Sequence, residues 1–250
     1  MKLKIFYFKR IYSLKTIPYL DLIIESKEHL VEIRERFFQF LFLGIFHIVC
    51  FFFSLDILCN FVIRILPEIQ FFQLSPQEYF LTSFFVGINF SILSIFPNLF
   101  KFFIFFLSPS LILKEKKTLF PIVSISTLLS LLAIFFSYYI LAPTTLRFFL
   151  DYNSKNIEPF WSFNDFSTFF FRLIYITILL FQIPLLQIFL CSINLVNKEE
   201  MIKNWKIIVC LSFLIGGILT PSTDPFTQFL LSLVICFLYG MGIFFFKFIY

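Results

Sequence analysis

Charged residues are scarce in this chain, since only 14% of its 250 residues are Asp, Glu, Lys or Arg. Hydrophobic residues make up 60% of it. A soluble domain of this size could not bury so much apolar surface. The composition therefore excludes a water-soluble globular protein. It predicts one membrane domain over residues 1–250, with no soluble part long enough to fold alone.

Cysteine and histidine are also few. The five cysteines form no CxxC pair, and only Cys59 is predicted on the outer side, so we expect no disulfide and no metal site. The two histidines, His29 and His47, are too few for paired haem ligation within a membrane. The chain is therefore predicted to hold no cofactor and to have no catalytic residues.

Long apolar runs are what the chain has in place of charge. Most of them reach the roughly 20 residues that cross a hydrocarbon core of about 30 Å. They predict an all-α membrane protein with six transmembrane helices and both termini on the same side. The runs are about 37–55, 79–107, 119–141, 166–190, 205–219 and 226–246.

The basic residues lie almost entirely on one side of these spans. That side carries 15 Lys or Arg: eight in residues 1–36, three each in loops near 114–117 and 198–206, and Lys247. The other side carries Arg64, Arg147 and Lys155. Basic residues are retained on the cytoplasmic side, so both termini are predicted to face the cytoplasm or the stroma.

Residues 21–36 are amphipathic, and Asp21 is a candidate N-cap. They predict an in-plane helix that leads into the first span. Five acidic residues precede Phe37, which is unlike secretory or transit peptides. We therefore expect synthesis in the compartment whose membrane the protein enters.

Three further patterns concern helix ends. The segment 75–78 (SPQE) has the form of a capping box before span two, and Pro97 is a candidate kink within that span. Outer loop 142–165 is rich in turn residues. Span five has only 15 residues, or about 22 Å of helix, which favours local thinning of the bilayer.

Five motifs then occur in the same order as in one known family. They are 29–36 (HLVEIRER), 106–109 (FLSP) with 114–116 (KEK), 135–143 (FFSYYILAP), 181–184 (FQIP) and 217–228 (GILTPSTDPFTQ). On these motifs nearly the whole chain resembles TatC, the polytopic receptor of the twin-arginine protein translocase. The FQIP and TPSTDP strings are similar to the cyanobacterial and plastid branch. They imply a plastid thylakoid membrane rather than a bacterial plasma membrane or a mitochondrial inner membrane.

The resemblance implies a site for twin-arginine signal peptides at the inner face. Guanidinium groups pair best with carboxylates, and Glu32 and Glu115 match the family's signal-binding acids. The other residues of this predicted site are His29, Leu30, Arg34 and Lys116. Lys116 stands where the family has arginine.

Each acid also has a plainer interpretation. Glu115 is the only acid of its loop, and it could simply balance the charge of the surrounding lysines. Glu32 could form an ion pair with Arg36, four residues further along a helix. In both interpretations the acid has a local role and does not bind the signal peptide.

Gln182 is a polar residue at mid-membrane and is a functional candidate for that reason. The resemblance implies that this position, an acid in bacterial members, docks a single-span partner subunit. Alternatively, Gln182 caps the Leu180 carbonyl, which Pro184 leaves without its usual donor. Five further motif residues are predicted to be structural: Pro109, Thr220, Pro221, Asp224 and Gln228.

The predicted function is a receptor subunit of the twin-arginine translocase that is not an enzyme. The resemblance implies TatA-like or TatB-like single-span partners, membrane lipids, assembly into a homo- or hetero-oligomer, and transport driven by the proton-motive force. No nucleic-acid partner is expected. Two alternatives remain: an ion-coupled secondary transporter, and a structural or assembly subunit of an energy-transducing membrane complex.

Overall fold

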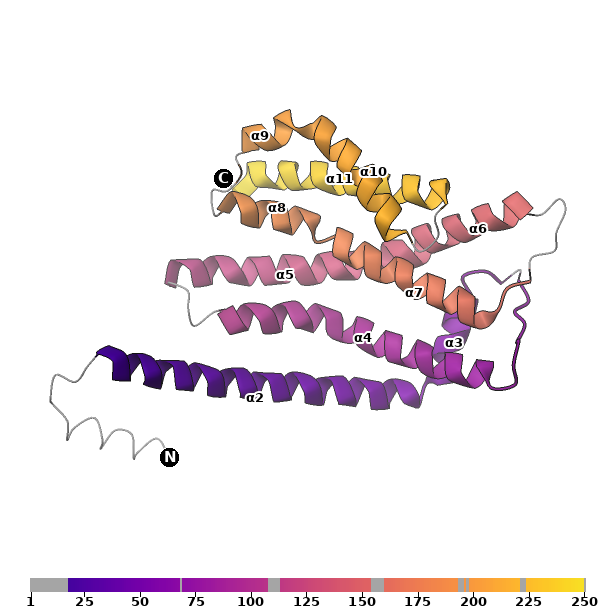
Figure 1. Ribbon diagram of the computed structural model, residues 1–250, viewed down its shortest axis with the longest axis horizontal. Coiled ribbons are helices and arrows are strands. Elements are labelled where there is room, and N and C mark those ends of the chain that lie inside the picture. The colour runs from indigo at the N-terminus through magenta and orange to yellow at the C-terminus, as the bar shows by residue number, and fades with distance from the viewer. Residues whose placement is uncertain are drawn as a thin grey trace. The chain divides into compact units, whose positions relative to one another are not determined.

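A computed structural model describes residues 18–67, 69–107, 113–153, 160–192, 196, 198–220 and 224–249. Nearly all of these residues are helical, and the β-structure among them is one isolated bridge between Phe72 and Ser162. The predicted all-α class is therefore confirmed. The elements, shown in Figure 1, are α2 (Pro18–Phe52), α3 (Leu55–Ile63), α4 (Glu78–Leu107), α5 (Leu113–Phe136), the π-helical η2 (Ser137–Leu141), α6 (Ala142–Asn153), α7 (Phe163–Leu180), α8 (Ile183–Ser192), α9 (Lys198–Lys203), α10 (Trp205–Leu219) and α11 (Pro225–Ile249).

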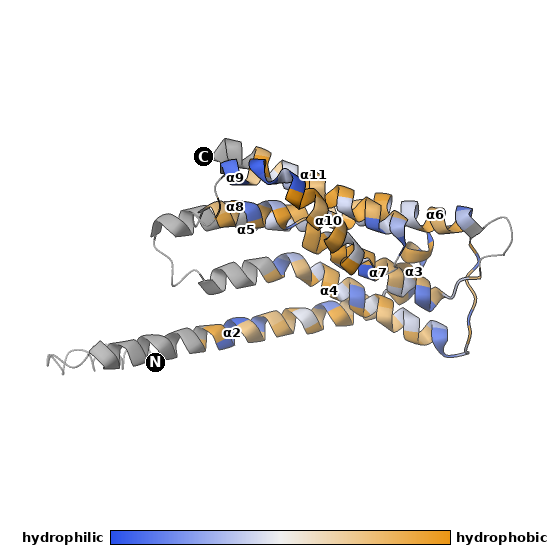
Figure 2. Cartoon of the chain, turned by 45° about the horizontal axis from the view of Figure 1, so that its top comes forward, coloured by the Kyte–Doolittle hydropathy of each residue, from blue (hydrophilic) through white to orange (hydrophobic). Residues whose placement is uncertain are grey.

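Within the described residues, five helical stretches are long and apolar enough to cross a membrane. They are Ile33–Phe52, Glu78–Leu99, Ser124–Tyr152, Phe163–Cys191 and Pro225–Phe244. The sixth predicted span is α10, whose bounds match the prediction of 205–219. Figure 2 shows the contrast between the hydrophobic α10 and the largely hydrophilic α9 before it.

The first helix corrects one prediction. Residues 1–43 and 44–250 form two compact units, and α2 runs without a break from Pro18 to Phe52. Residues 21–36 are therefore not a separate helix. Asp21 lies inside α2 rather than at its N-cap, because the helix begins at Pro18. No glycine or proline between residues 19 and 43 interrupts it.

The start of α4 confirms part of the predicted capping box. The Glu78 carboxylate accepts hydrogen bonds from the backbone N–H groups of Leu74 and Ser75. The helix begins at Glu78, two residues after the predicted start at Pro76. Pro97 lies inside this helix, as predicted.

The third span is longer than predicted at its outer end. A loop was expected from residue 142, but the chain continues through η2 into α6 and stays helical to Asn153. Two threonines that resemble turn residues support this helix instead. Thr144 donates to the Ile140 carbonyl, and Thr145 donates to the carbonyls of Leu141 and Ala142.

Helix α7 supplies much of the core of residues 44–250. Ten of its residues are buried, and the largest of them, Phe170 and Phe171, are almost wholly inaccessible. They pack with buried residues of α3, α4, η2 and α11. Many large apolar side chains on the other helices, such as Ile218 and Phe42, are exposed, as expected where lipid replaces protein neighbours.

Helices α8 and α11 approach each other closely at Gly242. A Cβ atom at this position would overlap Oε1 of Gln187 and lie 3.1 Å from Cα of Pro184. Gly240, one half-turn earlier, has open space where its Cβ would be. A side chain therefore has no room at Gly242 but has room at Gly240, although the two glycines are only two residues apart.

We predict that Gly242→Ala destabilises the protein by about 1–3 kcal/mol, the usual cost of overpacking a closed contact. Thermal unfolding in detergent, followed by circular dichroism, measures the change. Gly240→Ala is the matched control and should leave the midpoint unchanged or raise it, since alanine is the better helix former. Equal midpoints for the two variants would contradict the close contact.

Candidate functional site

The fourth span is interrupted at the predicted place. Helix α7 ends at Leu180 and α8 begins at Ile183, which leaves residues 181 and 182 as a turn. Pro184 has no N–H to donate to the Leu180 carbonyl, so the regular bonding pattern cannot pass through this point. Phe181 and Gln182 keep backbone bonds to Thr177 and Leu179. The turn therefore places the Gln182 side chain at a break within the membrane span.

The Gln182 side chain crosses to the third span. Its Oε1 accepts from Oγ of Ser126 at 3.1 Å, and its Nε2 donates to the Ser126 carbonyl at 3.5 Å. Ser126 is fully buried in α5, whereas Gln182 is half-buried. The observed bonds are thus not those of the local cap on Leu180. Both polar atoms of Gln182 are thus used within the protein, although the side chain is only partly buried.

A second intramembrane glutamine was not singled out from the sequence. Gln187 is buried in α8, and its Nε2 donates to the Tyr239 carbonyl in α11 at 3.3 Å. Its Oε1 is buried and, among the described residues, has no hydrogen-bond partner. The sequence does contain a signal for this contact. Gln187 is a polar residue within the apolar run 183–190, and the GMG segment of the sixth span offers glycines that a neighbouring helix could approach closely.

Asn89 and Tyr175 form another polar pair between spans that the sequence did not reveal. The Tyr175 hydroxyl donates to Oδ1 of Asn89 at 2.8 Å, while Nδ2 of Asn89 donates to the Phe85 carbonyl in its own helix. The pair joins α4 to α7. Asn89 is thus satisfied inside the protein, which favours a packing role for it.

Hydrogen bonds from side chains shape the turn between spans five and six. Asp224 accepts from the backbone N–H of Thr227 at 2.8 Å and from the Thr227 hydroxyl at 2.7 Å. It therefore caps α11, with Pro225 at the first helical position. Thr220 donates to the Gly217 carbonyl at the end of α10. Pro221 lies outside the described residues.

Gln228 joins the two helices that the turn connects. Its Nε2 donates to the Phe213 carbonyl in α10 at 3.0 Å. Gly216 and Gly217 make room for it, since a Cβ at Gly217 would lie 2.9 Å from that nitrogen. Of the residues of this turn, Gln228 thus joins α10 to α11, whereas Thr220 and Asp224 bond within the end of α10 and the start of α11.

The inner-face residues are placed by the helices that carry them. His29, Leu30, Glu32 and Arg34 belong to α2, and Arg34 is exposed. Glu115 and Lys116 lie in the first turn of α5 rather than in a loop. The side chains of His29, Leu30, Glu32, Glu115 and Lys116 are outside the described part of the structure, and so is Pro109. The predicted signal-peptide site therefore stays a prediction.

Metal chemistry has no candidate in the described ranges, where no three His, Cys, Asp or Glu side chains gather in a way that could hold an ion. The polar side chains that do gather are amides and hydroxyls. Such groups can dock a polar surface by hydrogen bonds, but they carry no charge to share with an ion.

Comparison with known proteins covers nearly the whole chain. The family model for the Sec-independent protein translocase protein TatC matches residues 28–246. The tatC-like protein ycf43 of Guillardia theta is 40% identical over 86% of this chain and 74% of its own length. TatC of Synechocystis sp. is 35% identical over 92% and 93%, and the chloroplastic TATC of Oryza sativa is 37% identical over 86% and 62%.

The fold is also that of a solved receptor. A crystal structure of the twin-arginine translocase receptor TatC aligns with a TM-score of 0.69 at 25% identity, covering 87% of this chain and 98% of the other. The apolar spans mark an integral membrane protein, and the chloroplast and cyanobacterial relatives support a plastid thylakoid membrane. The chain belongs to the TatC family of Sec-independent protein translocase proteins.

Proposed function

We propose that this protein is the translocase subunit that binds twin-arginine signal peptides and recruits single-span partner subunits, without catalysing a reaction. The observation that carries the proposal is the family match over residues 28–246, because it includes both segments with the candidate acids. The likeness to a solved twin-arginine translocase receptor supports the same role.

The negative charge of Glu115 supports it as the residue that binds the two arginines of the signal peptide. A receptor for two guanidinium groups needs carboxylates near the membrane surface, where a hydrophobic signal helix can also insert. Glu115 lies in the first turn of α5, next to the third span. A backbone ordered in a helix reduces the entropy that binding must otherwise remove. Glu32 in α2 is the second candidate acid.

The first test is binding of a twin-arginine signal peptide to the purified protein in detergent. We expect Glu115→Gln to weaken binding by about ten- to a hundredfold, the usual effect of losing a hydrogen bond to a charged group. A twin-lysine peptide should bind wild type weakly, because an ammonium group cannot make the bidentate pair.

The matched control is Glu199→Gln in α9, which removes an exposed acid of a neighbouring loop on the same predicted side. It should leave the affinity unchanged. Equal binding of both peptides by wild type, or equal losses in the two variants, would show that general charge rather than Glu115 determines the affinity. The receptor proposal would then lose its chemical basis.

The partner subunit is proposed to dock beside Gln182. Both polar atoms of this side chain bond to Ser126, but the amide oxygen keeps a second lone pair and the nitrogen a second N–H, which a polar group of a neighbouring helix could use. A neutral amide can donate and accept at once, which suits a polar residue of either kind. In lipid such an interhelical bond is worth about 0.6–2 kcal/mol, enough to orient a partner without holding it permanently.

Cross-linking of a single-span subunit to α7 or α8 tests this docking site. We expect Gln182→Leu to reduce the cross-link several-fold, because the partner's polar group would lose its hydrogen bond. Ser126→Ala is the matched variant, since it breaks the internal pair but keeps the glutamine. An equal loss in both variants would mean that Gln182 acts only by holding α5, and would contradict the docking role.

A further inference from the structure

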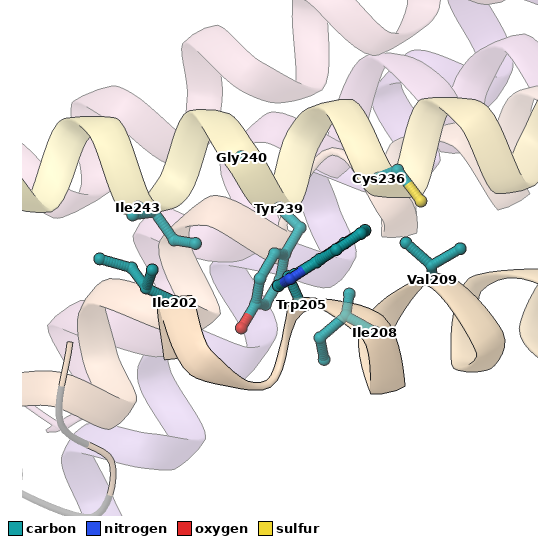
Figure 3. Close-up of a pocket in the computed structure, with 8 residues that line it drawn as sticks. All are labelled: Ile202, Trp205, Ile208, Val209, Cys236, Tyr239, Gly240 and Ile243. Atoms are coloured by element: carbon teal, nitrogen blue, oxygen red, sulfur yellow. The ribbon is translucent and has the colours of Figure 1, made fainter. Parts of the chain in front are cut away.

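An apolar groove runs between the fifth and sixth spans, next to the α9–α10 junction. Its volume is about 550 Å³, within the range of sites that hold small ligands. Figure 3 shows the side chains that surround it. They come from α9 (Ile202), α10 (Trp205, Ile208, Val209) and α11 (Cys236, Tyr239, Gly240, Ile243).

The walls of this groove are held in place by hydrogen bonds. The Tyr239 hydroxyl donates to the Met201 carbonyl at 3.1 Å and so ties α11 to α9. Three residues earlier along α11, Sγ of Cys236 lies 3.2 Å from Oγ of Ser212 and joins α11 to α10. These two hydrogen bonds fix the positions of the helices that form the groove.

A glycine forms part of the groove lining. Apart from its own helix, none of the described residues has an atom within 4 Å of the position that a Cβ of Gly240 would occupy, so this exposed position is open. In closely packed membrane helices, a glycine usually contacts the backbone of a neighbouring helix. In a bilayer the neighbouring material that can fill an apolar groove is an acyl chain.

Two basic residues are adjacent in the chain to residues that line the groove. Nζ of Lys206 lies 6.0 Å from the centroid of the Trp205 ring, which lines the groove. Lys203 is exposed in the last turn of α9 and follows the groove residue Ile202. The acids of this segment, Glu199 and Glu200, lie in the first turn of α9. The end of α9 nearest Trp205 is thus the basic end.

The helix lengths place this basic end of α9 among lipid headgroups. Helix α10 has 15 residues and spans about 22 Å, against about 30 Å for the hydrocarbon core. Headgroups are drawn inward beside such a short span. Trp205 and Tyr239 are also the residue types that concentrate at this depth, since they combine an apolar ring with a polar group.

We propose that this groove binds an anionic glycerolipid, with one acyl chain between α10 and α11 and the headgroup anion beside Lys203 and Lys206. The apolar lining matches the chain, and the two ammonium groups match the anion. The lipid would complete the contact between α9, α10 and α11 that the protein leaves open at Gly240. This role is independent of signal-peptide binding.

Tryptophan fluorescence provides a direct test, because the chain has only two tryptophans. Trp161→Phe leaves Trp205 as the single reporter in the groove. The full-length variant is placed in zwitterionic phosphatidylcholine bilayers that contain a small fraction of brominated phosphatidylglycerol, whose chains quench indole. We expect quenching to indicate about fivefold or greater local enrichment over brominated phosphatidylcholine, since each lysine near an anionic surface contributes roughly that factor.

Two variants separate the headgroup from the acyl chain. Lys203→Gln with Lys206→Gln should abolish the preference for the anionic lipid. Gly240→Leu should reduce quenching by filling the groove, whereas Leu233→Phe adds volume on an exposed part of α11 and should change nothing. The lysine variants alter only exposed side chains, so they keep the test valid even if Gly240→Leu does not fold.

Three results would overturn the proposal. Equal quenching by the two brominated lipids would mean contact with bulk bilayer only. Anionic preference that survives Gly240→Leu would mean headgroup attraction without a seated chain. Absence of quenching by either lipid would mean that another occupant, such as a protein helix, excludes lipid from the groove.

Discussion

Every backbone polar group inside a bilayer must find its partner within the protein, and in the fourth span a proline removes one of the usual donors. Pro184 interrupts the helical bonding pattern between α7 and α8. Two glutamines near this break bond to other spans. Gln182 bonds to Ser126 in α5, and Gln187 bonds to the Tyr239 carbonyl in α11. The two glutamines thus connect the third, fourth and sixth spans.

Tyr239 extends this connection toward the inner loop. Its carbonyl accepts from Gln187 in α8, and its hydroxyl donates to Met201 in α9. Gly242, one turn further along α11, allows α8 to approach closely. At the other end of α11, Asp224 and Gln228 hold the turn and the short α10. The sixth span therefore bonds to different neighbours along its length. The apolar groove lies between it and the start of α10.

Several elements followed from local patterns alone. The bounds of α10 agree with the apolar run 205–219, and Asp224 before Pro225 is an N-cap recognisable from residue types. The predictions failed where two local signals competed. The threonines after Ala142 resemble turn residues, yet they donate to carbonyls of the preceding turn and continue the helix. Residues 21–36 looked like a separate helix, but nothing in the sequence stops α2 there.

The sequence by itself determined the class of protein, the bounds of the short fifth span, the donor missing at Pro184 and the motifs that resemble TatC. These depend on bilayer thickness and on neighbouring residues, which a linear sequence displays directly. Only the tertiary structure decided that Gln182 pairs with Ser126, which is 56 residues away, and that Gly240 faces open space while Gly242 is closed by Gln187. No local pattern marks such partners, because they depend on how one helix is rotated against another.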